Sequence, residues 1–461
     1  MVMPRPATLL TALIVVAAAT IYFLPPPAGA TANVMHAGAL LVLVIGLWAI
    51  GSLPEYLTAL IFFTLAILLG IASPEVIFSG FASSTLWLVL GGLVIAEAVR
   101  STGLGERFAR VTLGNRTWSY PQLVTATVLV SIALSFLMPA TVGRILLLVP
   151  ILAAVAERHG LKPGSDGHNG VMLATILATF QCGTAILPAN APNLVLAGAA
   201  ETLYGVQLIY AEYLWAQFPV MGILKGALII AVVCWLFPAR TRTATTAADL
   251  RPMSGEEKRL TVIVLVSLVF WATDFLHGIR PGWIALAAAV AAMLPHVGAV
   301  PVSLFQDRVR FGTFFYIGAI LGLGAVMLET GLSAAIGNAL LGVIRLERDA
   351  DAVNFAVLSL LSTATGLLTT NPSQPALLAP LAGHFAEAAG WPLKAALMTM
   401  AVGFSTLIMP YQVPPVVVGM QVANLSLRTA LRMTVPLALI SIVTLIPLNY
   451  LWWRLIGYFG H

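Results

Sequence analysis

Long apolar runs separated by short polar segments make up most of this chain. A helix that crosses a membrane needs about 20 mainly apolar residues. Runs of this kind lie near residues 7–24, 36–52, 55–72, 82–99, 217–237, 260–276, 281–297, 312–328 and 432–453. The pattern predicts an all-α polytopic membrane protein with one transmembrane helix at each run.

Four further stretches are apolar but have polar or proline-rich centres, at 121–157, 169–201, 353–388 and 394–426. We interpret 121–157 and 353–388 as re-entrant hairpins that return to the side from which they start. We interpret 169–201 and 394–426 as membrane-crossing helices that are broken in the middle. The prediction is therefore about 11 transmembrane helices plus two re-entrant hairpins.

Residues 1–35 are predicted to hold the first transmembrane helix. Arg5, the apolar run and Ala28-Gly29-Ala30 also resemble a signal peptide with a small-residue cleavage site. The run from Ala7 to Leu24 is long for such a peptide, so we expect the helix to be retained.

Composition excludes an ordinary soluble protein. Charged residues make up 9% of the 461 residues, hydrophobic residues make up 59%, and the mean hydropathy is +0.97. A soluble domain usually carries about 25% charged residues. The net charge of +5 is spread along the chain, so no nucleic-acid partner is expected. Cys182 and Cys234 lie in apolar runs without metal-ligand spacing, and neither a metal cofactor nor a disulfide is expected.

The placement of Lys and Arg predicts the orientation. With the N-terminus in the cytoplasm, 16 of the 23 cations fall in cytoplasmic segments: Arg5, Arg100, Arg107, Arg110, Arg116, Arg158, Lys162, Arg240, Arg242, Arg251, Lys258, Arg259, Arg308, Arg310, Arg428 and Arg432. Five fall on the other side: Arg280, Arg345, Arg348, Lys394 and Arg454. This excess satisfies the positive-inside rule. It predicts a C-terminus outside, in a bacterial-type inner membrane.

Three local patterns recur in the same order in the two halves of the chain. The matching pairs are Thr102-Gly103-Leu104 with Thr330-Gly331-Leu332, Leu146–Pro150 with Ala376–Pro380, and Pro188–Asn193 with Pro410–Pro415. Three matches in order indicate an internal duplication.

The duplication predicts a domain division. The first repeat covers 36–238, a cytoplasmic linker covers 239–259, and the second repeat covers 260–461. Each repeat then has an odd number of spans, which inverts the second copy. This is the plan of an inverted-repeat transporter.

The polar centres of the hairpins and broken helices are candidate binding elements. Proline removes a backbone donor and disfavours helix in the preceding residue, and unpaired backbone in lipid is costly. Such breaks are tolerated where they line a protein cavity. There they offer N–H groups to an anion and C=O groups to a cation. Asn190, Asn193, Asn371 and Gln412 add side-chain oxygens at these breaks.

Two cations, Arg144 and Lys225, fall at membrane depth, where charge is usually functional. Arg144 can bind the substrate anion, hold a fixed charge where a sodium ion would otherwise sit, or snorkel to the cytoplasmic interface. Lys225 can pair with a carboxylate such as Glu97, titrate during transport, or snorkel.

The sequence resembles the divalent anion–sodium symporter family of dicarboxylate, citrate and sulfate transporters. The resemblance rests on Phe81–Ala98, the paired Thr-Gly-Leu segments, both hairpin turns and both proline-rich breaks, and it covers nearly the whole chain. It implies a scaffold and a moving transport part, a homodimer, and elevator-like alternating access.

The hairpin turns of that family usually read Ser-Asn-Thr. The second turn here, Thr370-Asn371-Pro372, keeps the Asn, whereas the first, Ala140-Thr141-Val142, lacks it. The resemblance therefore implies a second-half cation site at Thr369, Asn371 and Gln412. It implies a divergent first-half site at Ala140, Thr141 and Ala189.

We predict a secondary active transporter of small anions, in particular dicarboxylates, coupled to Na⁺ or H⁺, with membrane lipid and a second copy as partners. Substrate contacts are expected at both turns and both breaks: Thr141, Arg144, Asn190, Pro192, Asn193, Thr370, Asn371, Pro372, Val413 and Pro414. The alternative is a cation/proton antiporter or a sulfate-like oxyanion permease of the same wider superfamily. The spans hold no His-Glu-x-x-His motif and no paired acid/base set, so an enzyme is not expected.

Overall fold

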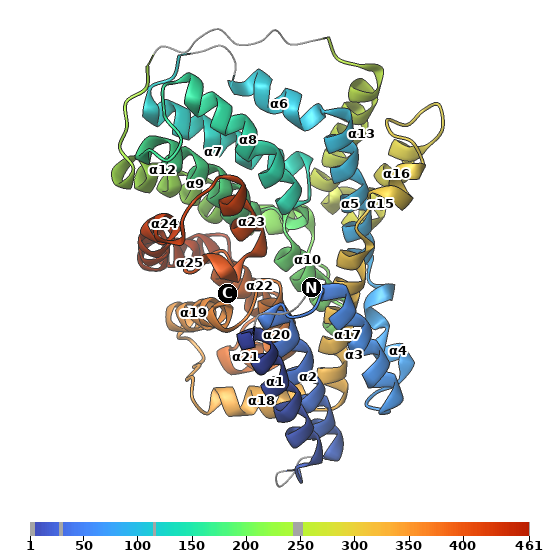
Figure 1. The fold of residues 1–461 in the computed structure, drawn as a ribbon. Coiled ribbons are helices and arrows are strands. Elements are labelled where there is room, and N and C mark those ends of the chain that lie inside the picture. The colour runs from blue at the N-terminus through green and yellow to red at the C-terminus, as the bar shows by residue number, and fades with distance from the viewer. Residues whose placement is uncertain (1–4, 27–30, 114–116, 243–251, 461) are drawn as a thin grey trace.

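The computed structural model describes residues 5–26, 31–113, 117–242 and 252–460, and within these ranges the fold is all-helical, as predicted (Figure 1). Seven helical segments there are long and apolar enough to cross a membrane: Ala32–Ile50, Ser84–Thr102, Tyr120–Leu137, Tyr210–Leu236, Phe311–Glu329, Asp351–Leu368 and Leu427–Leu455. The count of about 11 spans and the re-entrant course of the hairpins stay predictions. The Ala28-Gly29-Ala30 motif lies outside the described residues.

Helices occupy every predicted apolar run, with ends displaced by a few residues. The first half contains α1 (Arg5–Phe23), α2 (Ala32–Ile50), α3 (Glu55–Leu68), α4 (Pro74–Ile77), α5 (Ser84–Thr102), α6 (Leu104–Leu113), α7 (Tyr120–Leu137), α8 (Thr141–Arg158), α9 (Asp166–Gln181), α10 (Ala191–Tyr204), α11 (Tyr210–Gln217) and α12 (Lys225–Leu236). The second half contains α13 (Gly255–Ala272), α14 (Asp274–His277), α15 (Pro281–Met293), α16 (Ser303–Asp307), α17 (Phe311–Glu329), α18 (Leu332–Leu341), α19 (Asp351–Leu368), α20 (Ser373–Leu378), α21 (Ala382–Ala389), α22 (Leu393–Phe404), α23 (Pro414–Val422), α24 (Leu427–Ile440) and α25 (Ile446–Leu455).

The helix breaks fall where the proline and polar clusters predict them. Extended residues at 138–140 connect α7 to α8, and residues 369–372 connect α19 to α20. Between α9 and α10 the chain makes two 3₁₀ turns, Cys182–Ala185 and Leu187–Ala189. Between α22 and α23 it makes one, Pro410–Gln412. Both halves therefore contain a helix–turn–helix element followed by a broken helix.

The last long helix of each half contains a π-helical turn. Phe218–Leu224 joins α11 to α12, and Ser441–Leu445 joins α24 to α25. The two π turns contact each other, and α12 packs against α24. Single π turns inside α-helices occur often at functional sites. The order of elements agrees with the predicted duplication, while inversion of the second copy stays a prediction.

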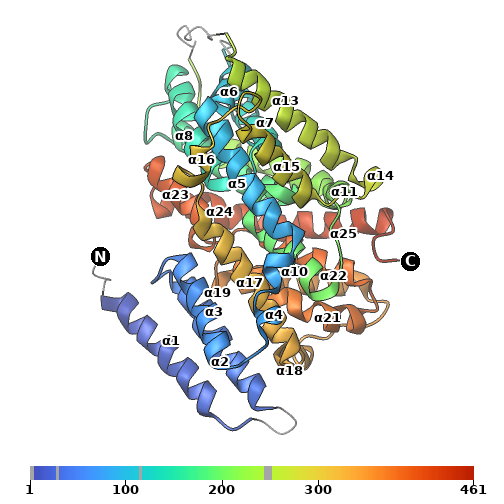
Figure 2. The ribbon, with the colours of Figure 1, turned by 90° about the vertical axis from the view of Figure 1, so that its right-hand side faces the viewer.

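The remaining helices form a frame beside these elements. α1 and α2 lie side by side at one edge of the molecule (Figure 2), and α17 packs against α3. α15 lies along α5 at very close range, since a Cβ atom at Gly282 would lie 1.9 Å from the carbonyl oxygen of Ser84. α10 packs against both α5 and α17, so one half of the first broken helix rests on this frame.

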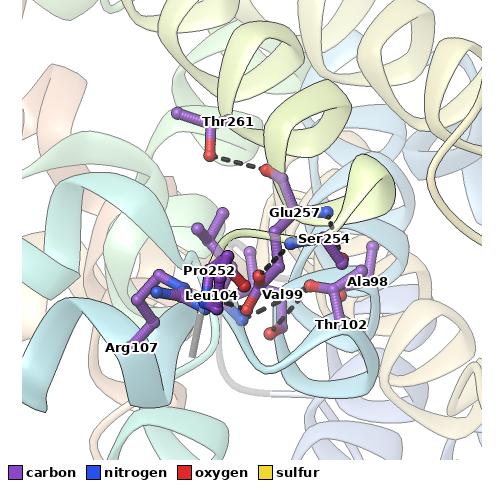
Figure 3. Close-up of polar contacts among 9 residues, drawn as sticks. All are labelled: Ala98, Val99, Thr102, Leu104, Arg107, Pro252, Ser254, Glu257 and Thr261. Carbon is purple, nitrogen blue, oxygen red and sulfur yellow. Dashed lines mark hydrogen bonds and ion pairs between the residues drawn. The ribbon is translucent and has the colours of Figure 1, made fainter. Parts of the chain in front are cut away.

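The described end of the predicted linker is tied to α6. Ser254 caps α13, which begins at Gly255 rather than at the expected residue 260, and residues 243–251 lie outside the described chain. Arg107 Nε lies 3.1 Å from the buried carboxylate of Glu257, and Arg107 Nη2 donates to Pro252 O at 3.0 Å (Figure 3). Removing one partner of a buried charge pair is strongly destabilising. This contact therefore fixes the start of the second half to the first.

Candidate substrate cavity and ion sites

Both hairpin turns and both helix breaks meet on one cavity of about 670 Å³. From the turns and breaks it is lined by Met138, Pro139, Ala140, Thr141, Val142, Gly143, Ala191, Pro192, Asn371, Pro372, Val413, Pro414 and Pro415. α5 and α17 supply most of the opposite wall, including Gly92 and Thr313. Small-molecule sites typically enclose about 300–1,000 Å³. Segments more than 200 residues apart in the chain thus form a space that fits a small ligand.

Arg144 lies behind the wall of this cavity and does not line it. Its side chain is fully buried, so it does not snorkel to the interface. Its guanidinium donates to five protein oxygens: Met138 O at 2.5 Å, Ala189 O at 3.0 Å, Thr179 O at 3.1 Å, Asn190 Oδ1 at 3.1 Å and Thr141 Oγ1 at 3.4 Å. Within the described chain no carboxylate pairs with it. A permanent positive charge is therefore held by neutral oxygens alone.

The predicted first-half ligands surround this guanidinium. Thr141 begins α8, and its hydroxyl donates to Asn190 Oδ1 at 2.5 Å and to Ala189 O at 3.2 Å. Asn190 precedes α10, and its Nδ2 donates to Phe180 O at 2.8 Å. Carbonyl and amide oxygens are the ligands that a hard cation takes in proteins. The first turn and the first break therefore surround the Arg144 guanidinium with oxygens of the kind that a cation takes.

The second-half site is also built from a turn and a break, but no guanidinium of the described chain occupies it. Asn371 N donates to Gln412 O at 2.7 Å, and Asn371 Nδ2 donates to Phe404 O at 2.9 Å. Asn371 Oδ1 and Thr406 Oγ1 are buried, and among the described residues neither has a hydrogen-bond partner. Buried polar oxygens are almost always satisfied. One unsatisfied oxygen on this turn, with a second two residues after Phe404, fits a site that takes a cation.

Other predicted second-half residues hold this turn together. Gln412 Oε1 accepts from Ile408 N and Met409 N at 2.9 and 2.7 Å, which satisfies the backbone of the second break. The Thr369 hydroxyl donates to the carbonyls of Thr365 and Thr370, at 3.3 and 3.2 Å. The Thr370 hydroxyl lies 3.1 Å from Ser373 Oγ. Gln412 also contacts Asn371 directly, because its backbone carbonyl accepts from Asn371 N.

Asn193 is placed away from the cavity. It is buried outside the cavity lining, and its Nδ2 donates to Ile186 O at 2.8 Å. In this conformation its amide supports the first break and does not reach the cavity wall.

The open end of the cavity contains charged residues that the sequence reading did not assign to the site. Glu97 and Arg100 of α5, together with Asp307, Arg308 and Arg310 before α17, line it. Arg100 Nε lies 3.0 Å from Glu97 Oε2, so Glu97 pairs with Arg100 and not with Lys225 as we had considered. Arg308 and Arg310 come directly before a predicted span, so in the sequence they indicate only the orientation of the chain. The packing of the helices brings them to the cavity.

Comparison with known proteins agrees with this architecture. The sequence profile of the sodium:sulfate symporter transmembrane region matches residues 7–459. The chain belongs to this family of divalent anion–sodium symporters. A membrane protein of Cupriavidus necator is 28% identical over 394 residues, which cover 82% of this chain and 76% of that protein. A putative malate transporter of Bacillus subtilis, YflS, is 25% identical over 343 residues, covering 69% of each chain.

Solved structures support the same fold. The crystal structure of the YdaH transporter of Alcanivorax borkumensis superposes with a TM-score of 0.58 at 14% identity, covering 99% of both chains. At that identity the likeness concerns the fold alone. Family membership makes this chain a multi-pass membrane anion transporter and confirms that it is not an enzyme.

Proposed function

We propose that this family member is a cation-coupled secondary transporter of small dicarboxylates. The observation that carries the proposal is the convergence of both turns and both breaks on one cavity of about 670 Å³. Helix starts at Thr141 and Ala191 bring free backbone N–H groups to its wall, and such groups bind carboxylates. The buried charge of Arg144 adds an attractive potential behind that wall. A relative is named as a malate transporter, which supports dicarboxylate as the cargo class.

We propose one sodium ion per cycle, bound in the second half. Asn371 Oδ1 and Thr406 Oγ1 are buried acceptors without protein partners among the described residues, and Asn371 also fixes the backbone of Gln412. Thr369 supports the turn that carries Asn371. A sodium ion at this place would satisfy the unpaired oxygens and add positive charge beside the substrate.

In the first half, Arg144 takes the role of a second sodium ion. The guanidinium already engages Ala189 O, Thr141 Oγ1 and Asn190 Oδ1, so the oxygens that would ligate a cation are occupied. The fixed charge still attracts the substrate anion, but one fewer sodium ion is transported in each cycle. It also explains why the first turn lacks the Asn that the second turn keeps.

The conformation supports alternating access. The exposed residues at the cavity opening, Arg100, Arg308 and Arg310, all belong to the cations that we predict to lie in the cytoplasm. The structure would therefore represent an inward-facing state. An elevator-like movement of the hairpins and broken helices against the α5–α15–α17 frame, a homodimer, and an inner-membrane location with a cytoplasmic N-terminus complete the proposal.

A sulfate-like oxyanion is the second candidate cargo. The family is described by its sodium:sulfate symporters, and a tetrahedral dianion can also use backbone N–H groups at helix starts. The size of the cavity favours the larger dicarboxylate, because sulfate would leave most of the space to water.

Uptake into proteoliposomes tests the proposed function. Labelled succinate should enter faster with an inward sodium gradient than without one, whereas sulfate and a sulfonate should enter more slowly. Asn371→Ala should raise the sodium concentration for half-maximal uptake at least about tenfold, because it removes a ligand oxygen. Thr370→Ala is the matched control on the same turn and should change sodium dependence little. Absence of gradient-driven uptake of all three anions would refute the proposal.

A further inference from the structure

Lys225 is a second buried cation that the proposed substrate and sodium sites do not use. It is the first residue of α12, directly after the π turn Phe218–Leu224, and its side chain is fully buried. Its Nζ donates to Ser441 Oγ at 3.0 Å, and Ser441 opens the π turn of the other half. Lys225 therefore lies at the contact between the two π-containing helices.

No carboxylate neutralises Lys225 in the part of the chain that the structure describes. The titratable group that faces it is the Cys182 thiol, since a Cβ atom at the adjacent Gly226 would lie 3.7 Å from Cys182 Sγ. The helices packed against α12 carry their other titratable groups near the opposite end of α12: Tyr120, Asp166, His168, Arg428 and Arg432. Arg432 contacts Leu236 O at that end, which is roughly 16 Å along the helix from Lys225.

The hydrogen bonds at Lys225 do not commit it to the charged form. An ammonium has three N–H donors, whereas one acceptor, Ser441 Oγ, is placed for it. Ser441 itself donates to Leu437 O at 2.6 Å, so its hydroxyl can only accept from Lys225. The charged form leaves two donors unpaired in a buried position, which is costly. The protonated and neutral forms are therefore much closer in free energy than they are for a lysine in water.

The position of Lys225 links its protonation to the substrate. Cys182 and Gly183 are adjacent residues of the 3₁₀ turn at the first break; Gly226 packs toward Cys182, while a Cβ atom at Gly183 would lie 3.1 Å from Arg144 Nη2. Two buried cations thus approach the same turn, and they repel each other. A dianion bound nearby offsets this repulsion. Anion binding favours protonation of Lys225, and by linkage protonation tightens anion binding to the same degree.

We propose that Lys225 is the proton-coupling residue of this transporter. Lys225 Nζ takes up a proton from water when the dianion binds, carries it as the ammonium, and releases it to water on the other side when the dianion leaves. This inference rests on the proposed function, because it needs a transported anion. One proton then moves in each transport cycle together with the sodium ion that we propose for the second half.

The test uses purified protein in proteoliposomes with equal sodium on both sides and the membrane potential clamped at zero. With the outside one pH unit more acidic, wild-type protein should accumulate labelled succinate up to about tenfold, since one coupled proton transmits the whole gradient. Lys225→Met should lose this accumulation while still exchanging internal for external succinate at equal pH. Lys225→Arg should also lose it, because a guanidinium stays charged.

Two matched variants control the experiment. Lys394→Met removes a half-exposed lysine paired with Glu212 and should accumulate succinate like the wild type. Ser441→Ala keeps the Lys225 amine but removes its hydrogen-bond acceptor, which disfavours the ammonium. The increase of uptake with acidity should therefore move to lower pH. This variant also tests the proposal if Lys225→Met does not fold. Changes in succinate protonation affect all variants equally.

The outcomes separate the two proposals. Wild-type protein that exchanges neither succinate nor another small anion would refute the proposed function. Wild-type protein that exchanges succinate but shows no pH-driven accumulation would overturn the role of Lys225. Accumulation by Lys225→Met or Lys225→Arg at the wild-type level would overturn it as well.

Discussion

At the scale of single residues, the two halves differ in how they hold positive charge. Around Arg144 five oxygens accept from a permanent guanidinium. Around Asn371 the corresponding oxygens are partly unpaired among the described residues. A covalently held charge cannot be driven by an ion gradient. In our proposal the Arg144 site therefore contributes to anion affinity, and the Asn371 site binds the coupling sodium ion.

Replacing Arg144 tests this division. Arg144→Gln should raise the succinate concentration for half-maximal uptake by at least about tenfold, because the buried charge behind the cavity is lost. It should also lower the melting temperature, because five acceptors lose charged donors and each is worth about 1–3 kcal/mol. The sodium concentration for half-maximal uptake should change little, because Asn371 is untouched. Uptake kinetics normalised to folded protein measure both effects. Arg110→Gln is the exposed control, because Arg110 does not line the cavity. A large loss of sodium affinity in Arg144→Gln would contradict the division.

At the scale of elements, one carboxylate joins the first broken helix to the frame. Glu201, near the end of α10, accepts hydrogen bonds from Ser83, Ser84 and Thr85 at the start of α5, and Arg280 pairs with it at 2.6 Å. This contact lies at one end of α5, while Glu97 and Arg100 at the other end line the cavity opening. The contact therefore closes α10 onto α5 on the side opposite the opening.

Glu201→Gln should weaken this closure. The Gln amide lacks the negative charge that Arg280 and the N-terminus of α5 stabilise. We therefore expect this conformation to lose about 1–3 kcal/mol of stability. A lower melting temperature in detergent and faster labelling of a cysteine introduced at Thr85 would report it. Glu212→Gln is the control, because its pair with Lys394 is half-exposed and such pairs are worth about 0–1 kcal/mol. Equal effects of the two variants would argue against a special role for Glu201.

At the scale of the whole molecule, orientation follows from the cations. With 16 of the 23 cations on one side and five on the other, we predict a C-terminus outside the cell. Alkaline phosphatase fused after His461 should be active, and green fluorescent protein at the same place should stay dark. A fusion in the 239–259 linker should give the reverse result. Fluorescence from the C-terminal fusion would show that the topology is the reverse of the predicted one. The inward-facing assignment would then be reversed as well.

Local chemistry determined much of this protein before any packing was considered. The helical class, the apolar spans and the four breaks are readable because they depend on the length of apolar runs and on proline, which act within a few residues. The Asn of the second turn and its absence from the first are also visible in the sequence alone. These features led to the family and to seven of the 29 residues that line the cavity.

Only the tertiary structure decided which groups meet. Glu97 and Lys225 were possible partners in the sequence, yet Glu97 pairs with Arg100 three residues away and Lys225 reaches Ser441 in the other half. Arg144 had three possible roles in the sequence, and the fold, which buries it among carbonyl oxygens behind the cavity, excludes snorkelling. Such contacts depend on how helices far apart in the chain pack, and no local pattern encodes the distance between them.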